Sequence, residues 1–464
     1  LKVEVWAQSP MVYSPVSMDM DAQGRIWYAE GIDYQIHKNH RIKGGKSIVV
    51  LTDTDKDGKA DKSHVFVREW FPQVPFGITV FDNKIVVSVT PEIIVYTDVN
   101  RNAVFDKGID KREVFLNGFK APHHYHILHQ VVPAPSGQWH FTFGNCGGDI
   151  RTKDGRHFIS GSYFHNSHLI GRKSSDGNQY IGGLGMRINP DGTGLEVTSE
   201  NLRNTHDMAV SSYGDIFHSD SDDPPHCRAT WVMEYGNLGY ADLYDGSRSW
   251  LETAKTWEDP FKRFNRARES HRSWGGEHHN NAHATKSHWR ENYPGTIPPG
   301  DIFGGGSPTG TIFYEGNALG PKMNGTYLCG DTVLNEVMLY TPKLKGAQIE
   351  MGKHTPLISV KRPQGNFFMP TDIVIGTDGA LYVCDFYNNG QATTNLTSGT
   401  IYRISRKDEK KFSRPEIDYK STEGLINALL NPSPSIRGTA VPLLVAKGDS
   451  IHIELEKAYD SSKE

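Results

Sequence analysis

Alternating apolar and polar residues, rather than a helical period, characterise most of the chain up to about residue 405. In several places two alternating runs flank a short polar turn containing glycine, asparagine or aspartate, which is the pattern of a β-hairpin. The predicted hairpins cover residues 16–31, 76–90, 127–145, 205–223 and 370–388. A sixth, weaker hairpin joins residues 309–316 to residues 324–332.

Six hairpins with further strands between them predict an all-β fold over residues 1–406: a six-bladed β-propeller with long rim insertions. The largest insertion is expected between about residues 250 and 306. A β-sandwich is the main alternative, although it rarely holds so many repeated hairpins in one domain. KVEVWAQ near the start and GTIYRIS near residue 405 are expected to pair and close the ring.

The pattern changes after the predicted propeller. Residues 407–420 are rich in charge and are expected to form a linker. Residues 421–464 then show helical spacing of apolar positions, which predicts two short amphipathic helices similar to a HEAT or armadillo unit. One such unit cannot bury its own apolar face, so this segment is expected to be the start of a longer, truncated helical domain.

Composition excludes some classes of function. The 464-residue chain has a formal net charge of −4 with scattered Lys and Arg, so no basic field is present to hold nucleic acid. No apolar run is long enough for a transmembrane segment, and no signal peptide precedes the first strand, so a leader has been removed or the chain starts inside the mature protein. The four cysteines are widely spaced and are expected to be buried apolar side chains, with one disulfide as the alternative.

Two acidic loops have the spacing of an EF-hand-like calcium loop. In DTDKDGKAD the expected ligands, with a backbone carbonyl at the seventh position, are Asp53, Asp55, Asp57, Lys59 and Asp61. In DVNRNAVFD they are Asp98, Asn100, Asn102 and Asp106. Converging carboxylates repel one another unless a hard cation is present, so the spacing favours an ion site. The alternative is a solvated acidic turn that holds no ion. The twelfth position of the first loop holds His64 in place of Glu, and either ion is expected to be structural.

Histidines gather in three segments that are expected at the rim of the propeller. They are His123, His124, His126 and His129, then His206, His218 and His226, then His271, His278, His279, His283 and His288. Imidazoles can act as a general base near neutral pH or bind a transition metal. A hydrogen-bonded loop residue is the alternative for each of them.

His126 is the first catalytic candidate. It directly precedes a strand, at a position from which a side chain is expected to point into the mouth of the central channel. The candidate substrate-binding residues are His123, His124, His278 and His279. Polar groups flank the fourth hairpin, so Arg203 and His206 are further catalytic candidates, and the candidate cofactor-binding residues are Arg203, Asn204, Asp220 and Asp222. The Arg203 guanidinium suits a carboxylate or sugar hydroxyls, and a salt bridge with a neighbouring aspartate is its alternative.

Three segments carry a family resemblance: LRNTHDMAVSSYGDIFHSDSDDPPH, FFMPTDIVIGTDGALYVCDFYNN and GTIYRI. They resemble the six-bladed propellers of the sorbosone dehydrogenase and soluble quinoprotein sugar dehydrogenase superfamily. The resemblance, over about residues 1–449, is closest to the bacterial branch in which a propeller precedes HEAT-like repeats and often a cytochrome c domain. It implies a periplasmic, secreted or outer-surface bacterial protein with a carbohydrate substrate and a cytochrome c electron acceptor.

In quinoprotein members, pyrroloquinoline quinone lies over a calcium ion, and a histidine before the third blade accepts the sugar hydroxyl proton. The resemblance assigns this role to His126, and the role of holding the cofactor to Arg203 and Asn204. Two departures argue against the quinone. Met369-Pro370-Thr371 stands where binding members carry arginines, and Glu315 stands where a basic residue is expected. Loss of these cations should weaken binding of a polycarboxylate.

Three functions follow from the sequence. The first is a sugar or polyol dehydrogenase-like oxidoreductase with a histidine base in the central channel. The second is a glycan lyase or hydrolase that uses the rim histidines, with a transition metal as an optional cofactor. The third is a carbohydrate-binding propeller without catalysis.

Overall fold

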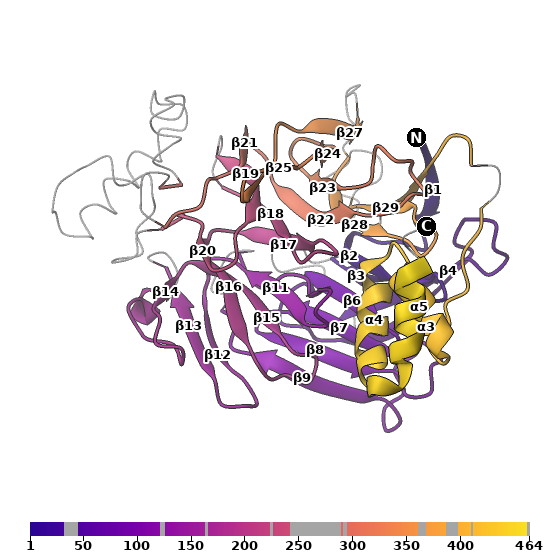
Figure 1. The fold of residues 1–464 in the computed structure, drawn as a ribbon, viewed down its shortest axis with the longest axis horizontal. Coiled ribbons are helices and arrows are strands. Elements are labelled where there is room, and N and C mark those ends of the chain that lie inside the picture. The colour runs from indigo at the N-terminus through magenta and orange to yellow at the C-terminus, as the bar shows by residue number, and fades with distance from the viewer. Residues whose placement is uncertain are drawn as a thin grey trace.

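The computed structural model describes residues 1–31, 45–120, 126–162, 166–222, 226–241, 289–290, 295–360, 368–386, 398–409 and 412–461. Within these ranges, six sheets of four or five strands surround a common centre (Figure 1). The predicted six-bladed β-propeller is therefore confirmed, and the β-sandwich alternative is wrong. Each predicted hairpin supplies the two inner strands of one blade.

The blades follow one another along the chain, and each is given from its innermost strand outward. Blade one is β2 (Pro15–Met20), β3 (Ile26–Glu30), β4 (Lys46–Thr52) and β5 (Lys62–Glu69). Blade two is β6 (Gly77–Phe81), β7 (Lys84–Val89), β8 (Glu92–Thr97) and β9 (Lys111–Asn117). Blade three is β10 (Val132–Pro133), β11 (Trp139–Phe143), β15 (Gly183–Ile188), β16 (Glu196–Leu202) and β20 (Gly236–Asn237).

The second half of the ring repeats this order. Blade four is β17 (Thr205–Val210), β18 (Ile216–Asp220), β19 (Cys227–Val232) and β21 (Asp301–Gly304). Blade five is β22 (Pro308–Tyr314), β23 (Thr326–Asp331), β24 (Glu336–Tyr340) and β27 (Thr355–Ser359). Blade six is β28 (Pro370–Ile375), β29 (Leu381–Asp385), β30 (Thr400–Ser405) and β1 (Lys2–Gln8). Two small sheets are β12 (Gly148–Arg151), β13 (His157–Gly161) and β14 (Tyr180–Ile181), and β25 (Lys343–Lys345) and β26 (Gln348–Glu350).

The first strand of the chain closes the ring. β1 pairs antiparallel with β30, from Lys2 opposite Ser405 to Gln8 opposite Thr400, so the predicted pairing of KVEVWAQ with GTIYRIS is confirmed. The turns within the blades also follow the prediction. Gly24 and Gly379, for example, adopt φ values of 72° and 77°, which a residue without Cβ reaches at little cost.

Carboxylates on the innermost strands tie neighbouring blades together. Asp19 accepts a hydrogen bond from the Val80 backbone N–H at 2.7 Å, which joins blades one and two. Asp372 accepts from the Met18 N–H at 2.7 Å, which joins blades six and one. Because these side chains replace hydrogen bonds that strands of different blades cannot make with each other, they fix the spacing of the blades around the axis.

The helical segment packs on one end of the propeller. It contains the helices α3 (Thr422–Leu429), α4 (Pro434–Val445) and α5 (His452–Ser461) and the short 3₁₀ turn η4 (Gly448–Ile451), while another such turn, η1 (Ser167–Leu169), lies in the insertion of blade three. The predicted helices are confirmed. Their apolar side chains, including Leu425 and Leu444, form a small core with Ala22 of blade one and Tyr419 of the preceding coil. The segment therefore buries its apolar face partly against the propeller, and its assignment to a HEAT-like repeat stays a prediction.

All four cysteines, Cys146, Cys227, Cys329 and Cys384, are buried free thiols, which confirms the first alternative and excludes the disulfide. None of the helices in the described residues has the length and hydropathy that a membrane span requires.

Candidate functional site

The innermost strands all start at the same end of the propeller. Thr309, at the start of β22, donates to the Pro370 carbonyl at 2.6 Å, and Thr371 in β28 donates to the Pro15 carbonyl of β2 at 2.7 Å. We call this end, where His126, Arg203 and Asn204 also precede their strands, the mouth. The opposite end is covered by α4, whose Ser435 hydroxyl donates to the Asp19 carboxylate at 2.7 Å.

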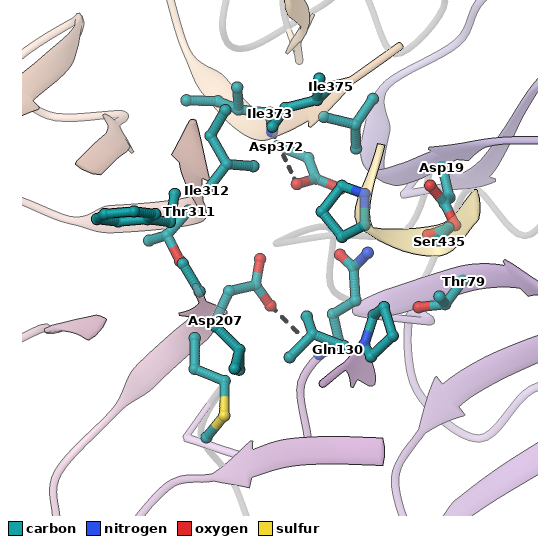
Figure 2. A pocket seen from close by; sticks show the side chains of 18 of the residues that line it. Asp19, Thr79, Gln130, Asp207, Thr311, Ile312, Asp372, Ile373, Ile375 and Ser435 are labelled. Atoms are coloured by element: carbon teal, nitrogen blue, oxygen red, sulfur yellow. Dashed lines mark hydrogen bonds between the residues drawn. The ribbon is translucent and has the colours of Figure 1, made fainter. Parts of the chain in front are cut away.

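Between the mouth and α4 lies a small axial cavity of about 60 Å³ (Figure 2). Five innermost strands each send one side chain toward it, and blade three contributes a residue that precedes β10, together with one helix residue. They are Asp19, Thr79, Gln130, Asp207, Thr311, Asp372 and Ser435. Small-molecule sites usually measure several hundred Å³, whereas this cavity has room for a few waters only. A molecule the size of a sugar or a large cofactor would therefore not fit inside the axis.

Burial changes the protonation of the axial carboxylates. It raises the pKa of Asp19 to about 7, although three hydrogen-bond donors oppose this. Burial also raises the pKa of Asp372 well above its ordinary range, and the nearby Asp207 carboxylate adds to this effect. At neutral pH these groups therefore hold protons more readily than surface carboxylates do, which limits the charge buried along the axis.

His126 is oriented at the mouth by Asn145. The His126 Nδ1 lies 2.7 Å from Asn145 Oδ1, while the Asn145 amide nitrogen donates to the Tyr240 hydroxyl at 3.2 Å. An amide oxygen only accepts, so Nδ1 carries the hydrogen and the lone pair of the neutral ring is on Nε2. Asn145 also donates its backbone N–H to the Arg203 carbonyl at 2.7 Å, which brings the His126 and Arg203 segments together.

Sequence reasoning did not single out Asn145 or Tyr240. Asn145 lies within the run FGNCGG and entered the prediction only as the last residue of the third hairpin. The signal that could have found it is its position one strand after His126, because adjacent inner strands of a blade place their ends side by side.

Arg203 is already paired. Its side chain is 9% exposed, its Nε lies 2.9 Å from Asp222 Oδ1, and Nη1 donates to the Ser221 carbonyl at 2.7 Å. This is the salt bridge that the sequence left as the alternative to ligand binding. The guanidinium charge is compensated within the protein, so Arg203 and Asp222 face each other before any ligand arrives.

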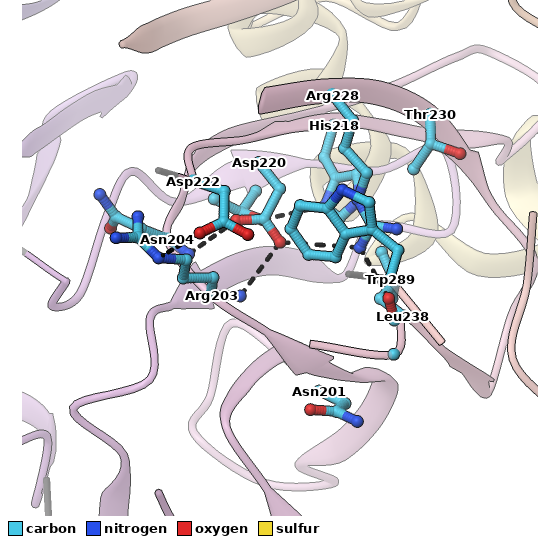
Figure 3. Close-up of polar contacts among 12 residues, drawn as sticks. Asn201, Arg203, Asn204, His218, Asp220, Asp222, Arg228, Thr230, Leu238 and Trp289 are labelled. Atoms are coloured by element: carbon cyan, nitrogen blue, oxygen red, sulfur yellow. Dashed lines mark hydrogen bonds and ion pairs between the residues drawn. The ribbon is translucent and has the colours of Figure 1, made fainter. Parts of the chain in front are cut away.

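Asp220 holds the backbone of the same segment (Figure 3). Its fully buried carboxylate accepts the Arg203 N–H at 3.0 Å and the Asn204 N–H at 2.7 Å. Burial raises the pKa of Asp220, and the nearby Arg228 guanidinium opposes that shift. Two of the predicted cofactor-binding residues thus contact the protein itself. Asp220 binds backbone N–H groups, and the Asn204 side-chain oxygen accepts a hydrogen bond from His129 Nε2 at 3.2 Å.

His206 stacks near His129 at the mouth. Their ring centroids are 4.6 Å apart, and Phe76 lies 5.8 Å from the His129 ring and 6.0 Å from the His206 ring. Burial, followed by the effect of His206, lowers the pKa of His129 well below its ordinary value. His129 is therefore neutral at physiological pH, while His206 Nδ1 lies 3.5 Å from the Asp207 carboxylate.

The four candidate substrate-binding residues, His123, His124, His278 and His279, lie outside the described residues. Among the residues that the structure does describe, no three histidine, cysteine or acidic side chains at the mouth converge as metal ligands. The transition-metal expectation for the rim histidines stays a prediction.

The first acidic loop brings three of its five predicted ligands together. One carboxylate oxygen from each of Asp53, Asp55 and Asp57 lies within 4.8 Å of the others. Gly58, at φ 92°, makes the sharp turn and donates its N–H to Asp53 at 3.1 Å. Asp61 turns back to accept from the Thr54 hydroxyl at 2.5 Å and from the Thr54 N–H at 3.2 Å, and these hydrogen bonds, the hydroxyl first, lower its pKa.

The Lys59 N–H donates to Asp57 at 2.8 Å, which holds that carboxylate in place. The described loop thus offers three convergent carboxylates, a donor set that suits a hard cation such as Ca²⁺.

The second acidic loop has the same backbone pattern with amides in place of carboxylates. Asp98 accepts the Asn102 and Ala103 N–H groups at 3.2 and 2.8 Å. The side-chain amides of Asn100 and Asn102 both donate to Asp106 at 2.7 Å, which lowers the pKa of Asp106. In this arrangement the polar side chains satisfy one another.

The two loops are neighbours, since His64 Nε2 lies 2.9 Å from the Ala103 carbonyl. Both connect the third and fourth strands of their blades, at the end opposite the mouth, where the ring of Phe412 lies against Gly58. Any ion held there would be remote from His126.

Comparison with known proteins places the chain by sequence and by fold. Residues 1–408 match the model of a family described as a domain of unknown function, DUF7133. No curated protein matches the chain in sequence.

Among solved structures, a Trichoderma reesei carbohydrate-active enzyme of family AA12 is 11% identical and aligns over 87% of this chain and 96% of that chain, with a TM-score of 0.53. The PQQ-bound aldose sugar dehydrogenase of Streptomyces coelicolor is 12% identical over 87% and 98%, with a TM-score of 0.51. A protein provisionally described as an oxidoreductase (glucose dehydrogenase) from Thermus thermophilus is 13% identical over 87% and 99%, with a TM-score of 0.52. At these identities the likeness establishes the shared propeller fold.

Proposed function

The chain belongs to the DUF7133 family, and we propose that it is a carbohydrate oxidoreductase of the sugar dehydrogenase type that acts on a sugar or polyol hydroxyl at the mouth. The observation that carries the proposal is the orientation of His126: Asn145 holds its Nδ1 at 2.7 Å and places the ring beside the Arg203 segment. The AA12 enzyme and the aldose sugar dehydrogenase, which share the fold, support the same chemistry. We further propose an exported protein that passes electrons to a cytochrome c.

The role of His126 is proton transfer. Oxidation of a secondary or hemiacetal hydroxyl breaks its O–H bond and the C–H bond on the same carbon, and a C=O bond forms. His126 Nε2 accepts the proton, and the hydride passes from the carbon to a two-electron organic acceptor bound at the mouth, which is reduced. Asn145 fixes the tautomer that presents Nε2, and a base so placed contributes roughly 10²–10⁴-fold in rate.

The described mouth does not fit pyrroloquinoline quinone. Arg203, which the resemblance assigned to the cofactor, is compensated by Asp222 at 2.9 Å. Met369 and Thr371 use their polar atoms on Asp385 and on the Pro15 carbonyl. A ligand with several carboxylates would find no uncompensated guanidinium among these residues, so no step of the reaction is assigned to the quinone.

The expectation that Glu315 replaces a basic cofactor ligand is wrong. Glu315 lies in the turn after β22, at the end covered by the helices. There it accepts from the Ser212 N–H at 3.0 Å and pairs with Arg437 of α4 at 3.3 Å. It cannot contribute to a pocket at the mouth. Separately, we propose that Asp53, Asp55 and Asp57 hold a structural Ca²⁺.

A glycan lyase is the second candidate. The misfit of the quinone favours it, because β-elimination from a uronic acid requires a base and no redox cofactor. In that reaction His126 would remove the proton next to the carboxyl carbon, the glycosidic C–O bond would break as a C=C bond forms, and the leaving sugar oxygen would take a proton from water. The same residue is thus the base in both candidates, and product analysis separates them.

The experiment compares wild type with His126→Gln and with His140→Gln. His140 lies in the same blade but is buried in β11, so it is a matched control. Protein as purified, supplied with Ca²⁺ and a two-electron acceptor dye, is assayed for dye reduction on aldoses and polyols, with the quinone added only in a parallel sample. Protein alone is assayed for unsaturated products from polysaccharides.

Dye reduction that falls by about 10²–10⁴-fold in His126→Gln, and persists in His140→Gln, is the expected result. Unsaturated products lost in the same variant would replace the dehydrogenase with the lyase. If folded wild type converts no substrate in either panel, the proposal of catalysis is wrong, and a binding propeller takes its place.

A further inference from the structure

Arg228 lies behind the mouth and does not reach it. The residue is on β19 and is fully buried. Its guanidinium carbon lies 3.6 Å from the centre of the Trp289 ring, and Nη2 donates to the Leu238 carbonyl at 2.9 Å (Figure 3). The same Nη2 lies 3.7 Å from Asp220 Oδ2. Arg228 is therefore fixed between an aromatic face and a carboxylate.

Asp220 transmits this placement to the mouth. Its carboxylate accepts the backbone N–H groups of Arg203 and Asn204, at 3.0 and 2.7 Å. The Arg203 carbonyl in turn accepts from Asn145, which orients His126. A continuous set of contacts thus joins a buried arginine to the proposed base.

Stability alone is a weak reason for such a pair. Removing two charges from water is costly, and a buried ion pair can often be replaced by apolar side chains of similar size without loss of stability. A carboxylate that receives two consecutive backbone N–H groups has a directional effect that an apolar side chain cannot reproduce. The aromatic face adds a cation–π contact that fixes the plane of the guanidinium.

We propose that Arg228 and Trp289 are positioning residues for the mouth: they fix the Asp220 carboxylate and, through it, the backbone of Arg203 and Asn204. Trp289 lies outside the six blades and is itself anchored, since its Nε1–H donates to the His226 carbonyl at 3.0 Å. The positioning stands on geometry alone, and its consequence for turnover rests on the proposed function.

The test is amide hydrogen exchange in Arg228→Lys and in Trp289→Phe. Lysine keeps the charge but loses the planar fork, and phenylalanine keeps an aromatic face but loses the anchoring N–H. Arg403→Lys is the control: Arg403 is also nearly buried, and it pairs with Asp378 at 2.8 Å and Glu409 at 2.7 Å in blade six. It should cost comparable stability without a link to the mouth.

In Arg228→Lys, exchange at the Arg203 and Asn204 amides should accelerate about tenfold, and in Trp289→Phe about threefold, because their shared acceptor loses its fixed position. Arg403→Lys should leave both amides unchanged. On a carbohydrate substrate, kcat should fall in Arg228→Lys while KM changes little, because the base is misaligned rather than the substrate lost.

The positioning is overturned if hydrogen exchange at both amides is unchanged in folded Arg228→Lys. If that variant does not fold, the same result in Trp289→Phe overturns it. Equal acceleration in Arg403→Lys also overturns it, because the effect would then be general loosening. Accelerated exchange in a protein that converts no carbohydrate supports the positioning and refutes the proposed function instead.

Discussion

Asp19 is a residue at which burial and hydrogen bonding act in opposite directions. Its carboxylate is 4% exposed and accepts hydrogen bonds from the Met20 N–H at 2.8 Å and from Val80 and Ser435 at 2.7 Å. Burial outweighs these donors and raises the pKa from 3.8 to about 7. We predict that the cost of Asp19→Asn therefore depends strongly on pH.

The sign follows from proton binding. Because the pKa is higher in the folded protein, this group's contribution to stability is complete below pH 3.8 and is lost as the pH rises to about 7. Between about pH 5 and about pH 8 the loss in wild type spans two pKa units, or about 3 kcal/mol. Asparagine does not titrate, and its mispaired amide costs about 1–3 kcal/mol at any pH. The penalty of Asp19→Asn relative to wild type should therefore shrink by about 3 kcal/mol between these pH values.

Urea unfolding followed by circular dichroism, at about pH 5 and about pH 8, measures this difference. The exposed Asp408, which pairs with Arg406, supplies the control variant Asp408→Asn, whose effect should not show this dependence. An equal penalty for Asp19→Asn at both pH values would refute the reasoning. It would mean that the three donors, and not burial, decide the ionisation of this carboxylate.

Three other predictions concern the remaining parts of the molecule. Adding Ca²⁺ to chelator-treated protein should raise the midpoint of thermal unfolding, and Asp55→Ala should remove most of that rise; no rise in wild type would contradict the proposed ion. Gly438→Leu should detach α4, because even a Cβ there would lie 2.4 Å from the Pro133 Cβ, and faster proteolysis of the linker would reveal it. Burial, with a smaller effect of Arg187, lowers the pKa of His140 to about 4, so stability is lost as the pH falls from 6.5 toward 4. His140→Gln should remove up to about 3 kcal/mol of that acid sensitivity in urea unfolding.

The blades could be predicted because each is specified locally. In β28 and β29 the period-two pattern and the glycine turn lie within about 20 residues, and the observed hairpin follows them. The covering of one end of the axial cavity by α4 could not be predicted in this way. Ser435 and Asp19 are 416 positions apart, and nothing in either neighbourhood identifies the other.

The sequence predicted which residues lie at the candidate site better than it predicted how their side chains are arranged. Sequence indicated that His126 and Arg203 precede innermost strands, and the structure joins them through Asn145. Whether Arg203 meets a ligand or Asp222 depends on side-chain direction, which spacing does not encode. The misplacement of Glu315 has the same origin, because alternation does not say at which end of the propeller a given turn lies.

The pairing of Lys2 with Ser405 has a consequence for biosynthesis. The propeller cannot close before the ribosome has synthesised residue 405. At roughly 5–20 residues per second, β1 therefore stays unpaired for roughly 20–80 s. During that time its backbone is an open template for other nascent chains. Lys2 and Glu4, both charged and on the outer strand, are the kind of side chains that discourage such premature partners.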